Sequence, residues 1–168
     1  MQDYICRIPT REEMEAKWDY EISLREGDKR NNWLIWKKSA IERAGKGMTL
    51  PYYGFLNGEI IAEATAALDP AVVENAQGLV DATTAYLFAF RTVDSQQGKG
   101  YFSKLFRYML EDLKARGYKR ATLGVEPDEI RNKAIYAHYG FTDFIKRCVE
   151  YYPDGTEVAV EYYGRNLE

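Results

Sequence analysis

The stretch that decides the fold is Asp94-Ser95-Gln96-Gln97-Gly98-Lys99-Gly100-Tyr101-Phe102, which joins two different hydrophobic patterns. Residues 85–93 before it are rich in aromatic and aliphatic side chains, which predicts a short strand buried on both faces. After it, apolar side chains recur at helical spacing until Gly117, a residue well suited to end a helix; they are Phe102, Leu105, Phe106, Met109, Leu110 and Leu113. The sequence therefore predicts a strand, a glycine-rich turn and an amphipathic helix.

This glycine turn has the chemistry of an anion site. Glycine allows the backbone to approach a ligand closely, and the first N–H groups of a helix have no acceptor within it and lie at the positive end of its dipole. A phosphate or pyrophosphate is the expected ligand, with plain turn chemistry as the equal alternative. A P-loop and a dinucleotide fingerprint are excluded, because no Ser or Thr follows Gly98-Lys99 and no third glycine completes the pattern.

Composition sets the class of protein. The 168 residues are 46% hydrophobic and 29% charged, which predicts a single domain over residues 1–168. A formal net charge of -3 leaves no basic footprint for nucleic acid. No apolar run is long enough to span a membrane, and Met1-Gln2-Asp3-Tyr4 lacks the basic start of a signal peptide, so we expect a cytoplasmic protein without a membrane partner.

Working outward, the patterns alternate between strands and helices. We expect strands at 4–8, 51–56, 59–68, 85–93, 121–125, 144–152 and 157–163, and helices opening at Thr10, covering 33–43, following Gly100 and ending before Gly140. Asn57-Gly58 and Pro153-Asp154-Gly155-Thr156 predict hairpin turns, while residues 69–83 read as a polar, mobile connection. The predicted fold class is α+β: a mostly antiparallel sheet of about seven strands, with about four helices and one parallel crossover.

The order of these predicted elements and two sequence motifs resemble the GNAT superfamily of acetyl-CoA-dependent N-acetyltransferases. The first is Gln97-Gly98-Lys99-Gly100-Tyr101-Phe102, in which Phe102 replaces the usual small residue. The second is Tyr136-Ala137-His138-Tyr139-Gly140-Phe141, with a tyrosine four residues before Gly-Phe. The spacing of the two motifs, with one helix and one strand between them, carries the resemblance, and it implies the GNAT fold.

The resemblance also implies a binding site for acetyl-CoA as co-substrate, without a metal. In this family the turn holds the pyrophosphate through its backbone, which assigns that role to Gln97, Gly98, Lys99, Gly100, Tyr101, Phe102 and Ser103. The preceding strand pairs with the pantetheine amides, which implies backbone contacts from Phe90, Arg91 and Thr92. A pantetheine-binding asparagine of the family is replaced by Glu129, so Asn132, one helical turn later, is the expected contact.

The implied reaction is direct attack of a primary amine, on a small molecule or a peptide, on the thioester. An alkyl ammonium with a pKa of about 10 must first lose a proton, and the CoA thiolate leaves better if it gains one. Tyr136 fits the acid, because a phenol stays protonated at neutral pH and can donate to a forming thiolate; its alternative is an aromatic packing residue. A non-catalytic acyl-CoA-binding module is the alternative function.

The base is predicted from strand periodicity. Relatives that acetylate ribosomal protein N-termini carry a glutamate where this chain has Gly124, and Glu126 lies on the same face of the strand. Glu126 is therefore the predicted base, acting directly or through water, with a solvated strand-end glutamate as the alternative. We expect Glu63, a second candidate, to point to water, and His138 to lie on the surface.

The remaining expectations concern partners. The resemblance places the amine acceptor near the two N-terminal helices and the last hairpin, where candidate lining residues are Trp33, Trp36, Tyr52, Tyr53, Tyr151 and Tyr152. Cys6 and Cys148 are expected to be buried, reduced thiols. Glu161-Tyr162-Tyr163 reads as an exposed edge strand that could pair with a second copy, which by analogy with such families gives a homodimer.

Overall fold

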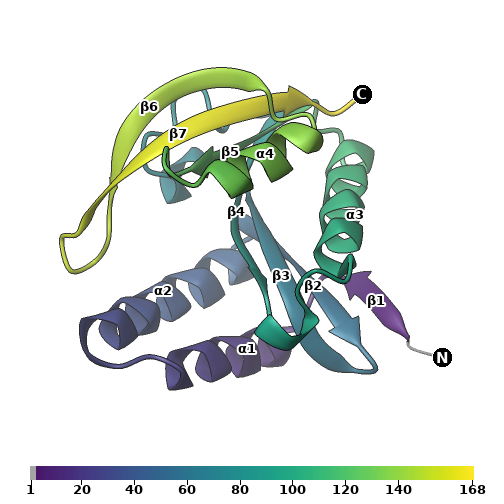
Figure 1. Ribbon diagram of the computed structural model, residues 1–168, viewed down its shortest axis with the longest axis vertical. Coiled ribbons are helices and arrows are strands. Elements are labelled where there is room, and N and C mark those ends of the chain that lie inside the picture. Colours follow the sequence, from purple (N-terminus) through teal and green to yellow (C-terminus); the bar gives the residue numbers. More distant parts are fainter. Residues whose placement is uncertain (1–2) are drawn as a thin grey trace. The chain divides into compact units, whose positions relative to one another are not determined.

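The computed structural model describes residues 3–168; Met1 and Gln2, read above as part of a chain start without a signal peptide, lie outside the described residues. Along the chain the elements are β1 (Tyr4–Arg7), α1 (Arg11–Ser23), α2 (Gly27–Gly45), β2 (Thr49–Leu56), β3 (Glu59–Ala67), the 3-10 turn η1 (Pro70–Val72), β4 (Thr84–Thr92), the 3-10 turn η2 (Asp94–Gln96), α3 (Tyr101–Ala115), β5 (Arg120–Val125), α4 (Ile130–His138), β6 (Asp143–Tyr151) and β7 (Glu157–Asn166) (Figure 1).

The strands form a seven-stranded sheet in the order β1-β2-β3-β4-β5-β7-β6. β4 and β5 are parallel, with Thr84 opposite Arg120 and Leu87 opposite Leu123. α3 provides the crossover that a parallel pair requires. β1–β2, β5–β7 and β6–β7 are antiparallel. The predicted fold class, a mostly antiparallel sheet with one parallel crossover, is confirmed.

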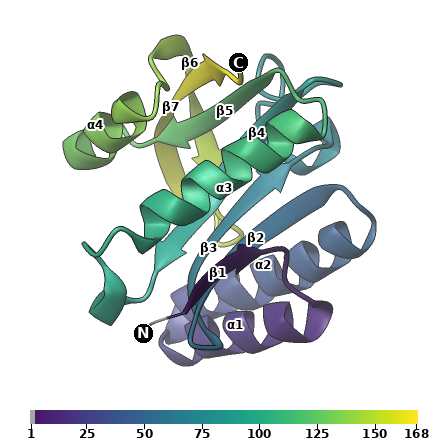
Figure 2. The ribbon, with the colours of Figure 1, turned by 90° about the vertical axis from the view of Figure 1, so that its right-hand side faces the viewer.

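The chain divides into two compact units, and the first contains the residues up to Thr65 together with Ala89–Met109. Its small core joins Met14 of α1 to Tyr53 and Phe55 of β2. β1 pairs with β2 along Tyr4–Arg7, and Figure 2 shows the two strands together with α1 and α2. α1 begins as predicted: Thr10 Oγ1 accepts from the backbone of Glu13, and Glu13 Oε1 accepts from the backbone of Thr10, which completes a capping box.

α2 differs from its prediction. It begins at Gly27, six residues before the predicted start at residue 33, and its cap residue Glu26 makes no side-chain capping bond. Only Asn32 is buried in the whole helix. The first turns of α2 are exposed and polar, so they carry no apolar period from which a helix start could be predicted.

The second unit contains Ala66–Phe88 and Leu110–Glu168. Its core gathers Leu79, Tyr86, Val160 and Tyr162 around β4, β5 and β7, with Cys148 of β6 packed against it. Figure 1 shows β6 and β7 as a long curved hairpin. Gly117 ends α3 with a φ of 98°, the left-handed conformation that its position predicted.

The prediction that residues 69–83 form a mobile connection is wrong. Leu79 is fully buried, and its carbonyl accepts a hydrogen bond from Thr122 Oγ1 at 2.8 Å. Lys146 Nζ donates to the carbonyls of Asn75 and Gln77 at 2.7 and 2.6 Å. These bonds fix the segment by long-range contacts, which leave no periodic signal in the sequence.

The expectation of an edge strand at Glu161-Tyr162-Tyr163 is also wrong. β7 pairs with β5 on one side and with β6 on the other, so its backbone groups are taken up within the sheet. The prediction of a homodimer was based on this edge and loses that basis; whether the protein forms a homodimer stays a prediction. Cys6 and Cys148 are half-buried free thiols. Among the described residues, no helix combines the length and the apolar character needed to cross a membrane.

Candidate active site

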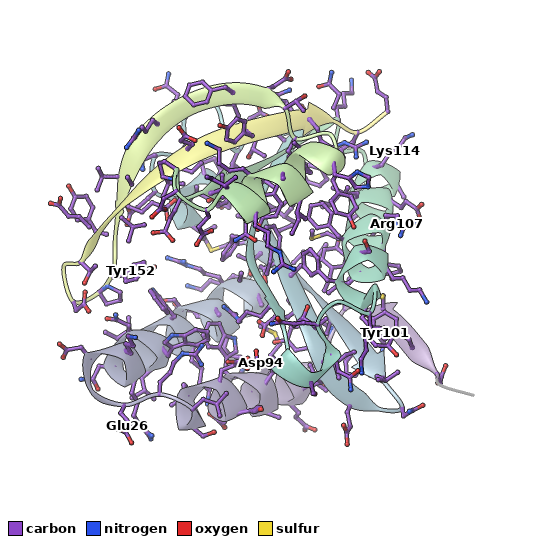
Figure 3. The ribbon with its side chains drawn as sticks, viewed as in Figure 1. Glu26, Asp94, Tyr101, Arg107, Lys114 and Tyr152 are labelled. Carbon is purple, nitrogen blue, oxygen red and sulfur yellow. The ribbon has the colours of Figure 1, made fainter. Side chains whose placement is uncertain are left out.

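The glycine turn lies in the first unit, between η2 and α3. Gly98 and Gly100 have φ values of 74° and 85°, a region that glycine adopts without strain. A Cβ at either position would meet nothing within 4 Å, so the backbone is open to a ligand there. Gln97 fastens the turn, because its Nε2 donates to the carbonyl of Thr92 and to Asp94 Oδ1 at 3.2 and 3.3 Å. Asp94 and Tyr101, labelled in Figure 3, mark the two ends of this turn.

Phe102 departs from the family motif, and the structure shows where its ring lies. The ring packs edge-on against Phe90 at 5.7 Å and stacks with Phe106 at 5.5 Å between centroids. An aromatic cluster of the first unit thus takes up the larger side chain. The backbone of the turn keeps its left-handed glycines beside this cluster.

β4 changes conformation in its middle. Its register with β5 covers Thr84–Leu87, and Ala89 then adopts a φ of 60°, which is unusual for a residue other than glycine. A left-handed residue inside a strand bends it in the way a β-bulge does. Phe90, Arg91 and Thr92, the predicted pantetheine contacts, follow directly after this bend in the first unit.

The side chain of Arg91 belongs to a buried ionic network of the first unit. Arg91 Nη2 donates to Glu63 Oε1 at 2.7 Å, and Lys17 Nζ lies 3.8 Å from Glu63 Oε2. Lys17 also pairs with Glu21 at 2.9 Å, and Arg25 pairs with Glu21 at 2.8 Å. Burial lowers the pKa of Arg91, but the charge of Glu63 outweighs it and the net pKa is raised.

Two indole rings cover this network. The guanidinium of Arg25 stacks on Trp33 at 3.6 Å, and that of Arg91 lies 4.6 Å from the same ring and 5.4 Å from Trp18. The expectation that Glu63 points to water is wrong, because only 2% of this residue is exposed. Glu63 is therefore the buried anion between two cations, Arg91 and Lys17. The apolar residues beside it in the strand give no indication of this role.

The predicted base lies in the second unit, in the turn between β5 and α4. Burial raises the pKa of Glu126, and so does a hydrogen bond that it shares with Glu129. Asn132 Nδ2 donates to Glu129 Oε2 at 2.8 Å, so the predicted pantetheine contact is engaged with this carboxylate. The negative charges of Glu129 and Asp128 add to the rise in the pKa of Glu126.

Tyr136, the predicted acid, lies on α4 of the same unit. Burial raises its pKa to about 12, and the negative charge of Glu129 adds to the shift. Its phenol therefore stays protonated across the neutral range, as a proton donor must. Tyr136 also lies within electrostatic range of Tyr86 on β4. His138 is exposed, as predicted.

Glu150 on β6 is a further residue of the site that was not predicted from the sequence. Tyr162 Oη donates to Glu150 Oε2 at 2.5 Å, and Tyr86 bonds the same carboxyl group. Burial raises the pKa of Glu150, although both tyrosine hydroxyls act against that shift. Its partners come from two other strands, β7 and β4, so no pattern within 144–152 indicates them.

The predicted lining residues separate into two groups. Tyr52 and Tyr53 are fully buried core residues of the first unit. Trp33 and Trp36 are half-buried on α2, and their rings contact each other at 5.8 Å. Tyr152, at the hairpin end of β6 in Figure 3, is 38% exposed and lies within electrostatic range of Glu126 and Glu150. The described part of the chain contains no group of His, Cys, Asp and Glu side chains arranged to hold a metal ion.

Gly124 has no room for a side chain, which gives a test of packing in the second unit. A Cβ at this position would lie 2.6 Å from Val160 Cγ1 and 2.9 Å from Tyr86 Oη. We expect Gly124→Ala to destabilise the protein by about 1–3 kcal/mol, as overpacked cores do. Gly45→Ala on α2 is the control, because a Cβ there meets nothing within 4 Å. Equal urea midpoints for the two variants would contradict the crowding at Gly124.

Comparison with known proteins now identifies the class. The model of the acetyltransferase (GNAT) family matches residues 10–141, which is most of the chain. The chain therefore belongs to the GNAT acetyltransferase family, and the predicted class of enzyme, an acyltransferase, is confirmed. A search of curated proteins found no match.

Solved structures share the fold at low identity. An N-acetyltransferase from Staphylococcus aureus Mu50 is 15% identical, with a TM-score of 0.68 over 99% of each chain. The ribosomal-protein-S18-alanine N-acetyltransferase from Escherichia coli is 16% identical, with a TM-score of 0.67 over 99% of this chain and 95% of that one. The yncA protein from Salmonella typhimurium, solved with its cofactor acetyl-CoA, is 15% identical, with a TM-score of 0.66 over 99% and 95%.

Proposed function

We propose that this GNAT protein is an N-acetyltransferase that moves the acetyl group of acetyl-CoA directly to a primary amine, without a covalent intermediate. The observation that carries the proposal is the arrangement of the second unit. The charge of Glu129 acts there on Tyr136, a phenol with a raised pKa, and Glu129 also shares a hydrogen bond with Glu126. Direct transfer from a thioester to an amine requires both kinds of group.

The cofactor-binding residues are proposed from the first unit. The backbone from Gln97 to Ser103 would hold the pyrophosphate, since Gly98 and Gly100 leave it open and α3 begins there. The backbone of Phe90, Arg91 and Thr92 would pair with the pantetheine amides. Acetyl-CoA supplies the acetyl group as a thioester, and these residues orient it.

The catalytic residues are proposed from the second unit. Tyr136 would protonate the departing thiolate, and Glu126 would take a proton from the amine, directly or through water. Asn132 is proposed to contact pantetheine; in this structure its amide nitrogen donates to Glu129.

The acceptor is proposed only as a class, a primary amine of a small molecule or a peptide. The Escherichia coli neighbour acts on an alanine of a ribosomal protein, which supports peptide amines as one group to be tested. The non-catalytic alternative was based on Phe102, Gly124 and Glu129. Phe102 now has an aromatic cluster around it and Glu129 bonds Glu126, so these departures give that alternative less support.

A thiol-release screen tests the function. The protein is incubated with acetyl-CoA and, in turn, with polyamines, free amino acids and peptides with unblocked N-termini, and free CoA thiol is titrated. We expect release that depends on one group of acceptors and an acetylated product in the mass spectrum. Binding of acetyl-CoA with no release in any arm would favour the non-catalytic module.

A thermal-shift series tests the cofactor site separately. At about 100 times Kd, acetyl-CoA should stabilise the protein by about 2.7 kcal/mol. Gly100→Ala and Gly117→Ala each place a side chain at a left-handed glycine with open surroundings. We expect Gly100→Ala alone to weaken binding, by about tenfold or 1.4 kcal/mol. If acetyl-CoA raises the melting temperature of both variants equally, the turn is not part of the binding site.

A further inference from the structure

Glu150 is the most unusual carboxylate of the second unit. It stands on β6 with its side chain half-buried, and Tyr162 on β7 and Tyr86 on β4 both bond its carboxyl group. Tyr162 is itself held, because Asn75 Nδ2 donates to its hydroxyl at 3.4 Å and to the carbonyl of Val149 at 3.1 Å. The carboxyl group therefore has a fixed orientation.

The strand register explains why these groups meet. Glu150 is opposite Val158 across the β6–β7 pair, and Gly124 is opposite Tyr162 across the β5–β7 pair. Val158 and Tyr162 are an even number of residues apart on β7, so all four positions share one face of the sheet. Because Gly124 has no side chain, the hydroxyl of Tyr86 can lie against β5 at this point and still reach Glu150.

Glu150 also differs from Glu126 in its partners. Burial and a hydrogen bond with another carboxyl group, that of Glu129, raise the pKa of Glu126, whereas Glu150 is bonded by two hydroxyl groups. The partners of Glu150 are phenols whose pKa values are raised by burial, so they stay protonated and donate to it. Groups from other elements also face it: Glu74 raises its pKa by charge repulsion, and Glu126 and Tyr152 lie within electrostatic range.

We propose that Glu150, in place of Glu126, takes the proton of the amine in this reaction and is held in position by Tyr162 and Tyr86; the inference rests on the proposed N-acetyltransferase function and revises only its base. An ammonium acceptor gives one proton to the Glu150 carboxylate. The amine then forms the N–C bond as the C–S bond breaks, and Tyr136 gives its proton to the leaving thiolate. The second nitrogen proton, lost as the amide forms, returns to the Tyr136 phenolate, and Glu150 releases its proton to water.

The test is the pH dependence of turnover in Glu150→Gln, measured with an acceptor found by the thiol-release screen. We expect kcat at neutral pH to fall by about a hundredfold, within the range for loss of general base catalysis. The loss should shrink by about tenfold for each unit of rising pH, because below its own pKa the free amine fraction grows at that rate. Unchanged kcat across the neutral range would overturn the proposal.

Two controls keep a folding defect apart from a catalytic one. Glu157→Gln changes an exposed glutamate of the same hairpin and should leave kcat unchanged. Each variant is also tested for its acetyl-CoA thermal shift, which Glu150→Gln should retain. If the wild type itself releases no thiol with any amine, the proposed function fails. If the wild type is active and Glu150→Gln is equally active, only the role of Glu150 fails.

Tyr162→Phe provides a second, milder variant. Its hydroxyl lowers the pKa of Glu150, so removing it should raise that pKa further. The acidic limb of the kcat profile should then move to higher pH, and the rate on the plateau should fall less than in Glu150→Gln. An acidic limb that stays at the wild-type pH would contradict the positioning role of Tyr162.

Discussion

Tyr136→Phe is expected to lower kcat by about a hundredfold or more while the Kd for acetyl-CoA changes little. The substitution removes one oxygen from a half-buried ring on α4, so packing is preserved. What it removes is the only proton that we assign to the leaving thiolate, and loss of such a proton donor typically costs between 10² and 10⁴ in rate. Steady-state thiol release at saturating acetyl-CoA measures the effect.

The control for this variant is Tyr108→Phe on α3. Tyr108 is 37% exposed, and we assign it no part in binding or proton transfer. It should keep the wild-type kcat. If Tyr136→Phe turns over as fast as Tyr108→Phe, the acid assignment is wrong and Tyr136 is a packing residue.

Glu63→Ala is expected to have the largest effect on stability, a loss of about 3–5 kcal/mol. Glu63 is the buried anion between Arg91 and Lys17, and its removal leaves the guanidinium without its 2.7 Å partner. A buried charge that loses its partner is strongly destabilising because water does not replace the lost bond. Urea unfolding at neutral pH measures the change in the free energy of unfolding.

Two further variants define the cause. Glu42→Ala removes a partner of Lys46 from an exposed pair on α2, and it should change stability little because water screens both charges. Glu63→Gln keeps the shape of the side chain and loses only the charge. If Glu63→Gln is as stable as the wild type, the network is held by packing on Trp18 and Trp33 and our electrostatic account is wrong.

The parts of the fold that the sequence predicted well are those specified by local chemistry. The helix after Gly100 has six apolar side chains at helical spacing, and Thr10 with Glu13 forms the capping box that its spacing indicates. Asn57 and Gly58 adopt φ values of 51° and 85°, as a two-residue hairpin turn requires. In each case the partners are near one another in the chain.

The parts that could not be predicted depend on distant partners. Glu63 stands in a strand that is buried on both faces, so alternation could not tell which way it points, and its partner Arg91 is 28 residues away. Glu150 lies in a strand, β6, that alternation predicts. The hydroxyl groups that bond its carboxyl group, however, come from Tyr86 and Tyr162 on other strands. No local pattern records a contact of that kind, and only the register of three strands reveals it.

At the position of Ala89, the residues that usually favour a strand do not fit the backbone. Valine and isoleucine suit the neighbouring positions of β4, but at a φ of 60° they are the residues least able to fit. Glycine and asparagine, poor strand formers elsewhere, would fit best here. A designer who followed the hydrophobic pattern of β4 would therefore choose a β-branched residue at position 89. That choice looks favourable for a strand, but it disfavours the left-handed conformation, and the bend before Phe90 would be lost.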